Sequence, residues 1–402
     1  MRKRYLYKVY DSSLNYITTW SDVMNDPEFT DVINGAPDVI VVQLARNVNA
    51  YGEGDDIDQN NYVFVWCFDG DAVDGVLIFS GYISEYTPTL KGNEEYLEVQ
   101  IFSFFAQLNR WMYEDSGTEE TTIVHSSVSP MAIMEDIFDK FTADGGLIDY
   151  GVGTLDDPGT TVSYTFNTQT VREAFDKVIE LSPVGWYAHI GADNIVHYAN
   201  KNTDADHIFT IGKDIALIQP QKRIQSIVNK IYFTGGDGGS GILYKKYTRS
   251  SSITDYGLYV KKVTDQRVTA ELTADTIAGR ILDTSDAPEI RTKIILVDNN
   301  GFDDGFGYDI ESVHPGDTVK VLGFSRTDYT RWDEAEWDVD VWDYSITDIT
   351  ATVQQIQKVT YHPDYIEIEL SNRLPDIAKR IEDINRNLVD SLTANNPTTP
   401  LT

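Results

Sequence analysis

The chain has 402 residues with 64 acidic and 32 basic side chains, which gives a formal net charge of −32. A chain of this length predicts several domains instead of one core, and a hydrophobic fraction of 41% excludes wholesale disorder. The charge argues against tight nucleic-acid binding and against docking on an anionic membrane, because both depend on clustered Lys and Arg.

Residues 1–110 predict an all-β domain, because short runs rich in β-branched and aromatic residues alternate with turn-forming residues, as in a sandwich or small barrel. The expected strands are Arg4–Tyr10, Tyr16–Thr19, Val39–Leu44, Tyr62–Phe68, Gly75–Tyr86 and Tyr96–Phe104. No apolar run follows the basic N-terminus, so no signal peptide is expected. No stretch approaches the roughly 18 apolar residues of a membrane-spanning helix, so no membrane anchor is expected.

Residues 113–215 predict a small α+β module. Ser129 and Pro130 begin a helix that continues to about Phe141, because Pro suits an early helical position and apolar residues then recur at helical spacing. A second helix is expected to begin near Thr170, which can cap it. A β-hairpin with strands at 185–190 and 195–198 completes the module.

Residues 216–372 predict a return to strands, with one helix at Thr273–Leu282. The glycine cluster Gly235–Gly241 is interpreted as a flexible tip, and residues 314–317 as a turn that leads into a strand. The expected strands are Val228–Phe233, Tyr244–Tyr247, Tyr259–Val263, Thr292–Asp298, Thr318–Leu322, Ile349–Tyr361 and Tyr365–Leu370.

The C-terminal region predicts a helix with a short heptad seam. Its apolar residues are spaced 3, 4, 3 and 4 apart, at Leu374, Ile377, Ile381, Ile384 and Leu388. Ile at seam positions favours three or four strands over two in a coiled coil, whereas a helix packed on its own domain is the alternative. The remaining residues, 395–402, are expected to fray.

No motif of the sequence indicates catalysis, and we expect no enzyme activity, cofactor or metal. The acidic turns Asp69–Gly75 and Val297–Gly305 resemble calcium loops but lack the full ligand pattern, so tight turns are favoured. His189 and His197 could face each other across the predicted hairpin, but no third ligand lies near them in the sequence. The single cysteine, Cys67, lies in an apolar run and is interpreted as a small buried side chain.

The segment from Arg331 to Tyr344 is the most unusual one. Trp332, Trp337 and Trp342 recur every five residues, and each precedes an Asp. Such residues can cover a neighbouring domain or subunit, or can stack on sugars. The interface interpretation is favoured, and glycan contact is the alternative.

The order of these segments resembles that of the tail hub, or tail-associated baseplate, proteins of tailed bacteriophages. No single motif is specific, and the Trp-rich segment looks like an insertion. The resemblance covers about residues 1–390 and is carried, in chain order, by Tyr5–Asp11, Ile78–Ile83, Thr170–Val178, Gly185–Tyr187, Ile227–Ile231, Asp255–Gly257, His314–Val319 and Tyr365–Leu370.

The resemblance implies a mainly β fold with two tube-protein-like β-barrel domains, two smaller α+β domains and a C-terminal helix. The implied division is 1–112 for the first barrel, 113–215 for an α+β module, 216–310 for a returning strand with the second module, 311–372 for the second barrel (sharing strand 224–235), and 373–402 for the helix and tail. Because the chain stops after a short helix, it is expected to carry no fibre or lytic domain itself.

The implied role is a homotrimeric hub in the virion, at the distal end of the tail. The implied partners are the distal tail ring, tail tube and tape-measure proteins and tip or fibre proteins, with DNA passing through an acidic lumen without tight binding. A carbohydrate-binding adhesin or receptor-binding tip protein that uses Trp332–Trp342 is the alternative. A secreted glycoside hydrolase is a weaker one, because no pair of carboxylates can be singled out.

Overall fold

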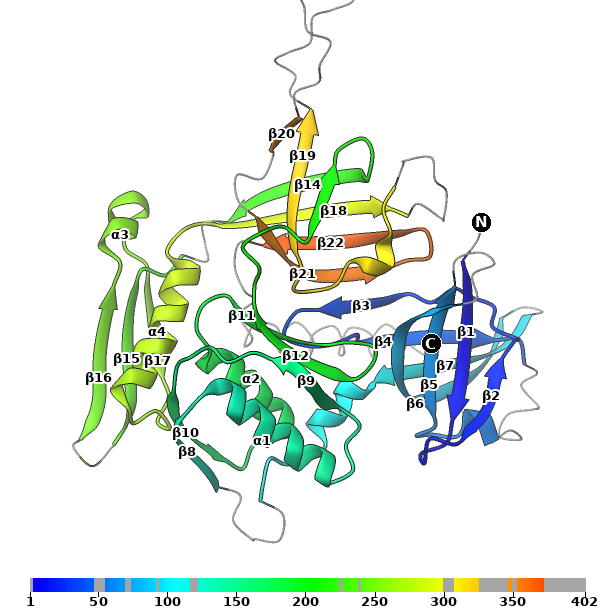
Figure 1. The fold of residues 1–402 in the computed structure, drawn as a ribbon, viewed down its shortest axis with the longest axis horizontal. Coiled ribbons are helices and arrows are strands. Elements are labelled where there is room, and N and C mark those ends of the chain that lie inside the picture. The colour runs from blue at the N-terminus through cyan, green and yellow to red at the C-terminus, as the bar shows by residue number, and fades with distance from the viewer. Residues whose placement is uncertain are drawn as a thin grey trace, which may run out of the picture.

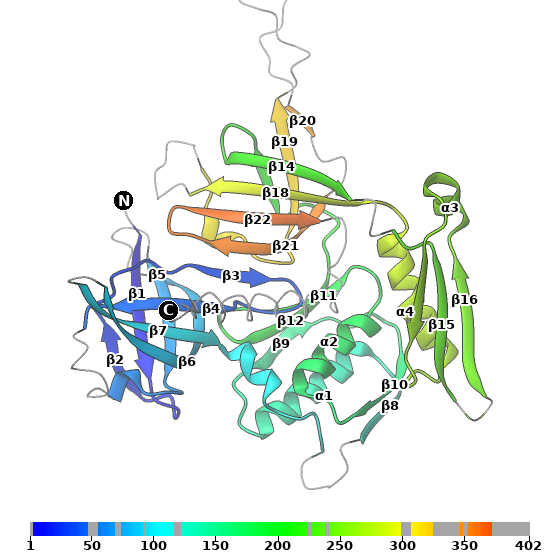
Figure 2. The same ribbon diagram turned by 180° about the vertical axis from the view of Figure 1, so that it is seen from behind.

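The computed structural model describes residues 3–46, 55–68, 74–91, 94–115, 122–223, 227–237, 239, 241–298, 307–324, 346–348 and 353–371. This part of the chain is mainly β-structure, with five sheets and four α-helices. Figures 1 and 2 show a blue β-domain at one end, a yellow-to-orange β-domain beside it, and α+β modules in cyan to yellow-green. The predicted mainly β fold, with several sheets and a few helices, is therefore confirmed.

The first β-domain is a six-stranded antiparallel sheet in the order β2-β1-β5-β6-β7-β4. Alternate residues such as Val9, Val63 and Val65 point into its core and are fully buried. All six predicted strands are present, and β6 is longer than expected. Their bounds are β1 (Arg4–Tyr10), β2 (Tyr16–Trp20), β4 (Val39–Leu44), β5 (Tyr62–Phe68), β6 (Val76–Lys91) and β7 (Glu94–Ser103).

The two edges of this sheet meet. The segment that follows β2 forms a bridge to β4 at Val23 and Leu44. Backbone hydrogen bonds from Met24 N–H to Gln43 O (2.8 Å) and from Ala45 N–H to the carbonyl of residue 22 (2.8 Å) reinforce it. The sheet therefore curls back on itself, which satisfies backbone groups that an open edge would leave unpaired.

The second β-domain has the order β13-β19-β21-β22-β18-β14, and β20 (Ile346–Asp348) pairs with β19. Its edge strands β13 and β14 are joined by a turn only four residues long, 211–214, so this sheet must also curve to bring its edges together. The bounds are β13 (His207–Thr210), β14 (Ile215–Arg223), β18 (Glu289–Val297), β19 (Thr318–Phe324), β21 (Gln354–Tyr361) and β22 (Tyr365–Ser371).

The two β-domains share one cyclic strand order. If the six main strands of each domain are numbered in chain order, both follow the circuit 1-4-5-6-3-2. Both also insert extra chain between strands 2 and 3, and a short 3₁₀ helix between strands 3 and 4: η2 (Asp55–Ile57) and η4 (Ile310–Ser312). They differ in strand 1, because β13 runs parallel to β19 whereas β1 runs antiparallel to β5.

A short strand connects the domains. The segment β3 (Phe29–Val32) follows β2 in the chain, but it pairs with β21 of the second domain, with Phe29 opposite Tyr361. β3 was not predicted from the sequence, because its four residues come soon after an Asp-Pro pair and are too few to show alternation.

In Figure 1 the first α+β module lies below the second β-domain and to the left of the first. Thr170 Oγ1 accepts a hydrogen bond from Glu173 N–H, and Glu173 Oε2 accepts one from Thr170 N–H. This capping box begins α2 where the sequence predicted a capped helix start. Ser129 Oγ caps α1 by accepting one hydrogen bond from Ala132 N–H. The bounds are η3 (Phe104–Asn109), β8 (Thr122–Val128), α1 (Pro130–Ala143), β9 (Asp149–Leu155), β10 (Val162–Asn167), α2 (Val171–Leu181), β11 (Trp186–Ile190) and β12 (Ile195–Asn200).

The second module is the sheet β16-β15-β17 with helix α4 on one face, and its hydrophobic residues join one cluster with those of the first module. The strand predicted at 224–235 therefore does not enter the second β-domain, which takes β14 instead. The bounds are β15 (Lys230–Asp237), β16 (Ile242–Thr248), α3 (Ser250–Tyr256), β17 (Val260–Thr264) and α4 (Glu271–Ser285).

The interpretation of the glycine cluster as a flexible tip is wrong for Gly235 and Gly236, which are buried inside β15. A Cβ at Gly236 would lie 1.9 Å from the carbonyl oxygen of Gln266, and one at Gly235 would lie 2.4 Å from that of Val268. Because these glycines have no Cβ, the backbone at 266–268 can approach the strand closely. No helix among the described residues is long and apolar enough to cross a membrane.

Candidate functional site: the junction of the β-sheets

The end of β3 binds the first α+β module through backbone and side-chain contacts. Asn34 N–H donates to Ala188 O (2.7 Å), and Ala188 N–H donates to Asn34 Oδ1 (3.1 Å). Ile190 N–H donates to Gly35 O at 2.8 Å. The segment therefore contacts β21 through β3 and β11 through its following turn, so it joins three parts of the molecule.

A buried ion pair reinforces this contact. His189 Nε2 lies 2.9 Å from Asp31 Oδ2, and the two residues are 7% and 4% exposed. Burial opposes the charged imidazole, but Asp31, with smaller contributions from Asp317 and Asp193, raises the pKa of His189 above its ordinary value. His189 was singled out from the sequence as a residue facing His197, and the two are cross-strand partners in the β11–β12 hairpin.

Aromatic side chains fill the contact between the two β-domains. Phe29 stacks on Tyr361 with ring centroids 4.7 Å apart and meets Phe79 edge to face at 5.6 Å. The hydroxyl of Tyr361 donates to Val313 O at 2.6 Å. Burial and nearby carboxylates raise the pKa of Tyr361 far above its ordinary value, so this hydroxyl stays protonated and remains a donor.

A second buried charge cluster links the start of β1 to the second β-domain. Lys3 Nζ lies 3.0 Å from Asp298 Oδ2 and also pairs with Glu311. Burial lowers the pKa of Lys3, but the two carboxylates outweigh it and raise that pKa above its ordinary value. Cys67, predicted to be a small buried side chain, is buried and places its Sγ 3.6 Å from Glu311 Oε1.

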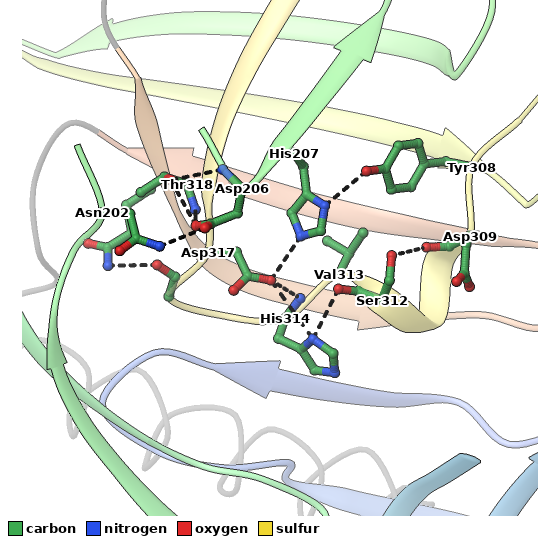
Figure 3. Close-up of polar contacts among 12 residues, drawn as sticks. Asn202, Asp206, His207, Tyr308, Asp309, Ser312, Val313, His314, Asp317 and Thr318 are labelled. Atoms are coloured by element: carbon green, nitrogen blue, oxygen red, sulfur yellow. Dashed lines mark hydrogen bonds and ion pairs between the residues drawn. The ribbon is translucent and has the colours of Figure 1, made fainter. Parts of the chain in front are cut away.

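The turn 314–317 organises a polar network within the second β-domain, shown in Figure 3. Asp317 Oδ2 accepts from the backbone N–H of His314 (2.8 Å) and lies 3.0 Å from His207 Nε2. The other ring nitrogen of His207 lies 2.9 Å from the hydroxyl of Tyr308. Because both nitrogens of His207 have partners in the network, neither is available to take a proton from a substrate.

Asp206 fixes the parallel alignment of β13 with β19, as Figure 3 also shows. It precedes β13, and its Oδ2 accepts from the backbone N–H and the hydroxyl of Thr318, both at 2.8 Å. Asn202 Nδ2 donates to its other oxygen at 2.6 Å. Although burial acts in the opposite direction, these hydrogen bonds lower the pKa of Asp206. The carboxylate therefore clamps the first residue of β19.

Gly316 is the point where this turn touches the first α+β module. Its φ of 101° is in the left-handed region, and a Cβ there would lie 2.3 Å from Tyr187 Cε2. Gln355 Nε2 donates to the carbonyl of Gly316 at 2.9 Å. The glycine therefore lets β11 and the turn approach closely.

Taken together, the junction ties sheets to one another and has no arrangement for chemistry. Within the described residues, no group of three or more His, Cys, Asp or Glu side chains could hold a metal ion. Most of the two acidic turns, 69–75 and 297–305, lies outside the described residues. So do the predicted seam residues Leu374, Ile377, Ile381, Ile384 and Leu388 and the tryptophans Trp332, Trp337 and Trp342.

Asp31, Lys3 and His207 were not predicted from the sequence to be junction residues. Asp31 and His189 are 158 residues apart, and His207 and Asp317 are 110 apart. No local pattern signals such pairs, and the sequence indicated only the turn at 314–317 and His189.

No protein-family model and no curated protein matches the sequence. Solved structures do share the fold. The prophage tail protein gp18 from Listeria monocytogenes EGD-e matches with a TM-score of 0.58 and 14% identity, over 95% of this chain and 99% of that chain.

Two further tail proteins match over similar lengths. The 43 kDa tail protein of prophage MuSo2 from Shewanella oneidensis has a TM-score of 0.56 and 11% identity, covering 92% of this chain and 98% of its own. A tail protein from Neisseria meningitidis MC58 has a TM-score of 0.56 and 10% identity, covering 92% and 96%. The chain thus has the fold of phage tail proteins over nearly its whole length, as the resemblance predicted.

Proposed function

We propose that this chain is a structural hub protein at the distal tip or baseplate of a phage tail, and that it works as a homotrimer. The shared strand circuit of the two β-domains is the observation that carries the proposal. A trimer would present six such domains, so a threefold protein could continue a sixfold tail tube with tube-like barrels. The near full-length likeness to solved tail proteins supports the same role.

The junction supports a ring-forming role physically. Each β-domain would have to keep a fixed position relative to the other if the two are to act as neighbouring units of one ring. The shared strand β3 and the buried pair Lys3–Asp298 hold that position, and the buried pair Asp31–His189 ties β3 to the first α+β module. A buried pair is sensitive to geometry, because separating the partners leaves an uncompensated charge.

The charge of −32 fits a channel for DNA. Carboxylates that face a lumen repel phosphates, so DNA would slide through without sticking. In this proposal the partners are the distal tail ring, tail tube and tape-measure proteins on one side and tip or fibre proteins on the other. The virion tail tip is the location.

The test is the mass of the purified full chain by light scattering, beside an Ile381→Asp/Ile384→Asp variant. The matched control is Ala378→Asp/Val389→Asp, which adds the same charge to the same segment but off the predicted seam. We expect a trimer that the seam variant weakens and the control leaves intact, because a buried carboxylate disrupts a heptad seam.

A trimer that both variants leave intact would support the hub proposal and would indicate that the subunit contacts lie in the β-domains. A monomer at high concentration, with the native fold retained, would overturn the proposal.

A further inference from the structure

The sheet β16-β15-β17 has one covered face and one open face. Ile231 and Phe233 of β15 are buried under α4, together with the partly buried Leu243 and Val263 of the flanking strands. Residues at the alternate positions point the opposite way, because side chains alternate across a strand. In Figures 1 and 2 this sheet lies at the end of the molecule away from the first β-domain.

Lysines and tyrosines occupy the open face. Tyr232 lies directly opposite Lys246 on one side and Lys262 on the other, so the three side chains share the face. Lys230 and Tyr244 lie two residues further along the same strands. We call Lys230, Tyr232, Tyr244, Lys246 and Lys262 the lysine–tyrosine face.

Among the described residues, these lysines form no ion pair with a carboxylate, unlike their neighbour Lys245 on the covered face. Lys245 pairs with Glu271 and with Asp275 of α4, the latter at 2.7 Å. Among the described residues, no carboxylate lies within ion-pair distance of Lys246 or Lys262. Lys230, which lies 5.2 Å from the Tyr232 ring centroid, and Lys246 lower the pKa of Tyr232, as expected in a locally positive field.

Apolar surface accompanies the charge. Tyr244 is 69% exposed, Ile242 54% and Val260 53%. The strand β16 is also an edge of its sheet, so one row of its backbone groups faces outward. Exposed aromatic and aliphatic residues around an open strand edge are typical of surfaces that bind extended protein segments.

Lysines on an exposed edge can also serve only to prevent aggregation. That explanation is weak here, because a chain with a net charge of −32 already repels its copies, and added lysines reduce that repulsion. A positive face on so acidic a chain instead favours an acidic partner.

The sequence contains such a partner. Residues 331–344 carry one Arg and six acidic residues, interleaved with three tryptophans: Asp333, Glu334, Glu336, Asp338, Asp340 and Asp343 with Trp332, Trp337 and Trp342. This segment departs from Phe324 of β19 and returns at Ile346 of β20, and these two residues are paired. If residues 325–345 ran outward and back as two extended halves, they would reach about 35 Å from that pair of residues.

We propose that the lysine–tyrosine face binds the acidic, Trp-rich segment 331–344 of a neighbouring copy of the chain. Carboxylates would pair with the lysines, and indole rings would pack on Tyr232, Tyr244 and the lysine ammonium groups. The proposal takes the segment from a neighbouring copy because β19 points away from the sheet: in Figure 1 its tip is at the top, whereas the sheet β16-β15-β17 lies lower, at the left. This docking proposal rests on the proposed function in one respect: copies of the chain must assemble.

The test measures binding of a labelled peptide of residues 331–344 by fluorescence anisotropy. The receptor is the full chain with the six acidic residues of its own segment changed to Asn or Gln, so that the face is unoccupied. We compare it with the same chain carrying Lys246→Glu/Lys262→Glu. The matched control is Lys201→Glu/Lys213→Glu, which changes charge equally at exposed lysines outside the sheet.

We expect saturable binding that weakens at least roughly tenfold in the sheet variant, weakens with added NaCl, and is unchanged in the control. A peptide with its acids replaced by amides should bind as poorly as the sheet variant does. No binding, or equal loss in both double variants, would overturn the proposal. Displacement of the peptide by double-stranded DNA at equal charge would also overturn it, because the face would then be a general anion site.

Trimer formation, measured on the same samples by light scattering, separates the two proposals. A trimer without peptide binding would contradict only the docking contact, and peptide binding by a monomer would contradict only the trimeric hub.

Discussion

At the scale of single residues, the buried pair Asp31–His189 is the most sensitive point of the junction. Neither residue can move to solvent without opening the contact between β3 and β11. Removing one partner of a buried pair leaves a charge without compensation, which costs about 3–5 kcal/mol.

The pair predicts a pH-dependent stability. Because the pKa of His189 is raised on folding, its contribution is complete below the unfolded value near 6.5 and is lost as the pH rises through the folded value. His189→Gln should therefore lower the free energy of unfolding more at pH 5.5 than at pH 9. Urea unfolding at the two pH values measures this.

His197 provides a control of opposite sign, because partial burial lowers its pKa on folding, although Asp193 acts in the opposite direction and His189 and His314 in the same one. Its charging opposes folding in acid, so His197→Gln should become relatively more favourable as the pH falls. Equal pH profiles for the two variants would contradict the account.

At the scale of elements, β3 determines whether the two β-domains unfold together. Phe29→Ala removes the ring that packs on Tyr361 and Phe79, and large-to-small changes in a core cost about 3–5 kcal/mol. We expect faster hydrogen exchange in Lys358–Tyr361 and separate unfolding of the two domains, measured by mass spectrometry and by calorimetry.

Val63→Ala is the matched control, because Val63 lies in the core of the first domain and its strand does not pair with β21. It should lower stability without raising exchange in β21. Faster exchange there in both variants would show that β3 is not the connection.

The same strand shows what the sequence could and could not predict. The bounds of strands β1 and β5 were predicted to the residue. Over seven residues, the alternation of side-chain types in the sequence indicates which side chains are buried. β3 was not predicted, because its structure depends on Lys358–Tyr361, more than 320 residues later. Gly235 and Gly236 were assigned to a loop because glycine is common in turns, while here it admits a passing backbone.

In the candidate junction, too, only residues with a local sequence signal were predicted. The turn at 314–317 has a local signal in Pro and Gly, and His189 was noticed from its hairpin. Their partners Asp31 and His207 were not, since strand pairing between distant segments decides which side chains meet.

At the scale of the whole molecule, the net charge of −32 opposes compactness. The screening length falls from about 30 Å at 0.01 M salt to about 3 Å at 1 M. We expect the melting temperature to rise by roughly 2–5 °C between 20 mM and 500 mM NaCl, measured by calorimetry. KCl should raise the melting temperature equally. A fall in the melting temperature in both salts would show that surface ion pairs outweigh the repulsion among the acidic side chains.

The pairing of β3 with β21 also has a consequence for synthesis. Thr30 and Thr360 are neighbours in the fold but 330 residues apart in the chain. At about 5–20 residues per second, a ribosome takes roughly 16–65 s to make the intervening chain. During that time the first domain can fold while β3 waits as an unpaired edge, open to other nascent chains. The order in which the parts are translated therefore exposes this strand at the stage when the folding chain is most prone to aggregate.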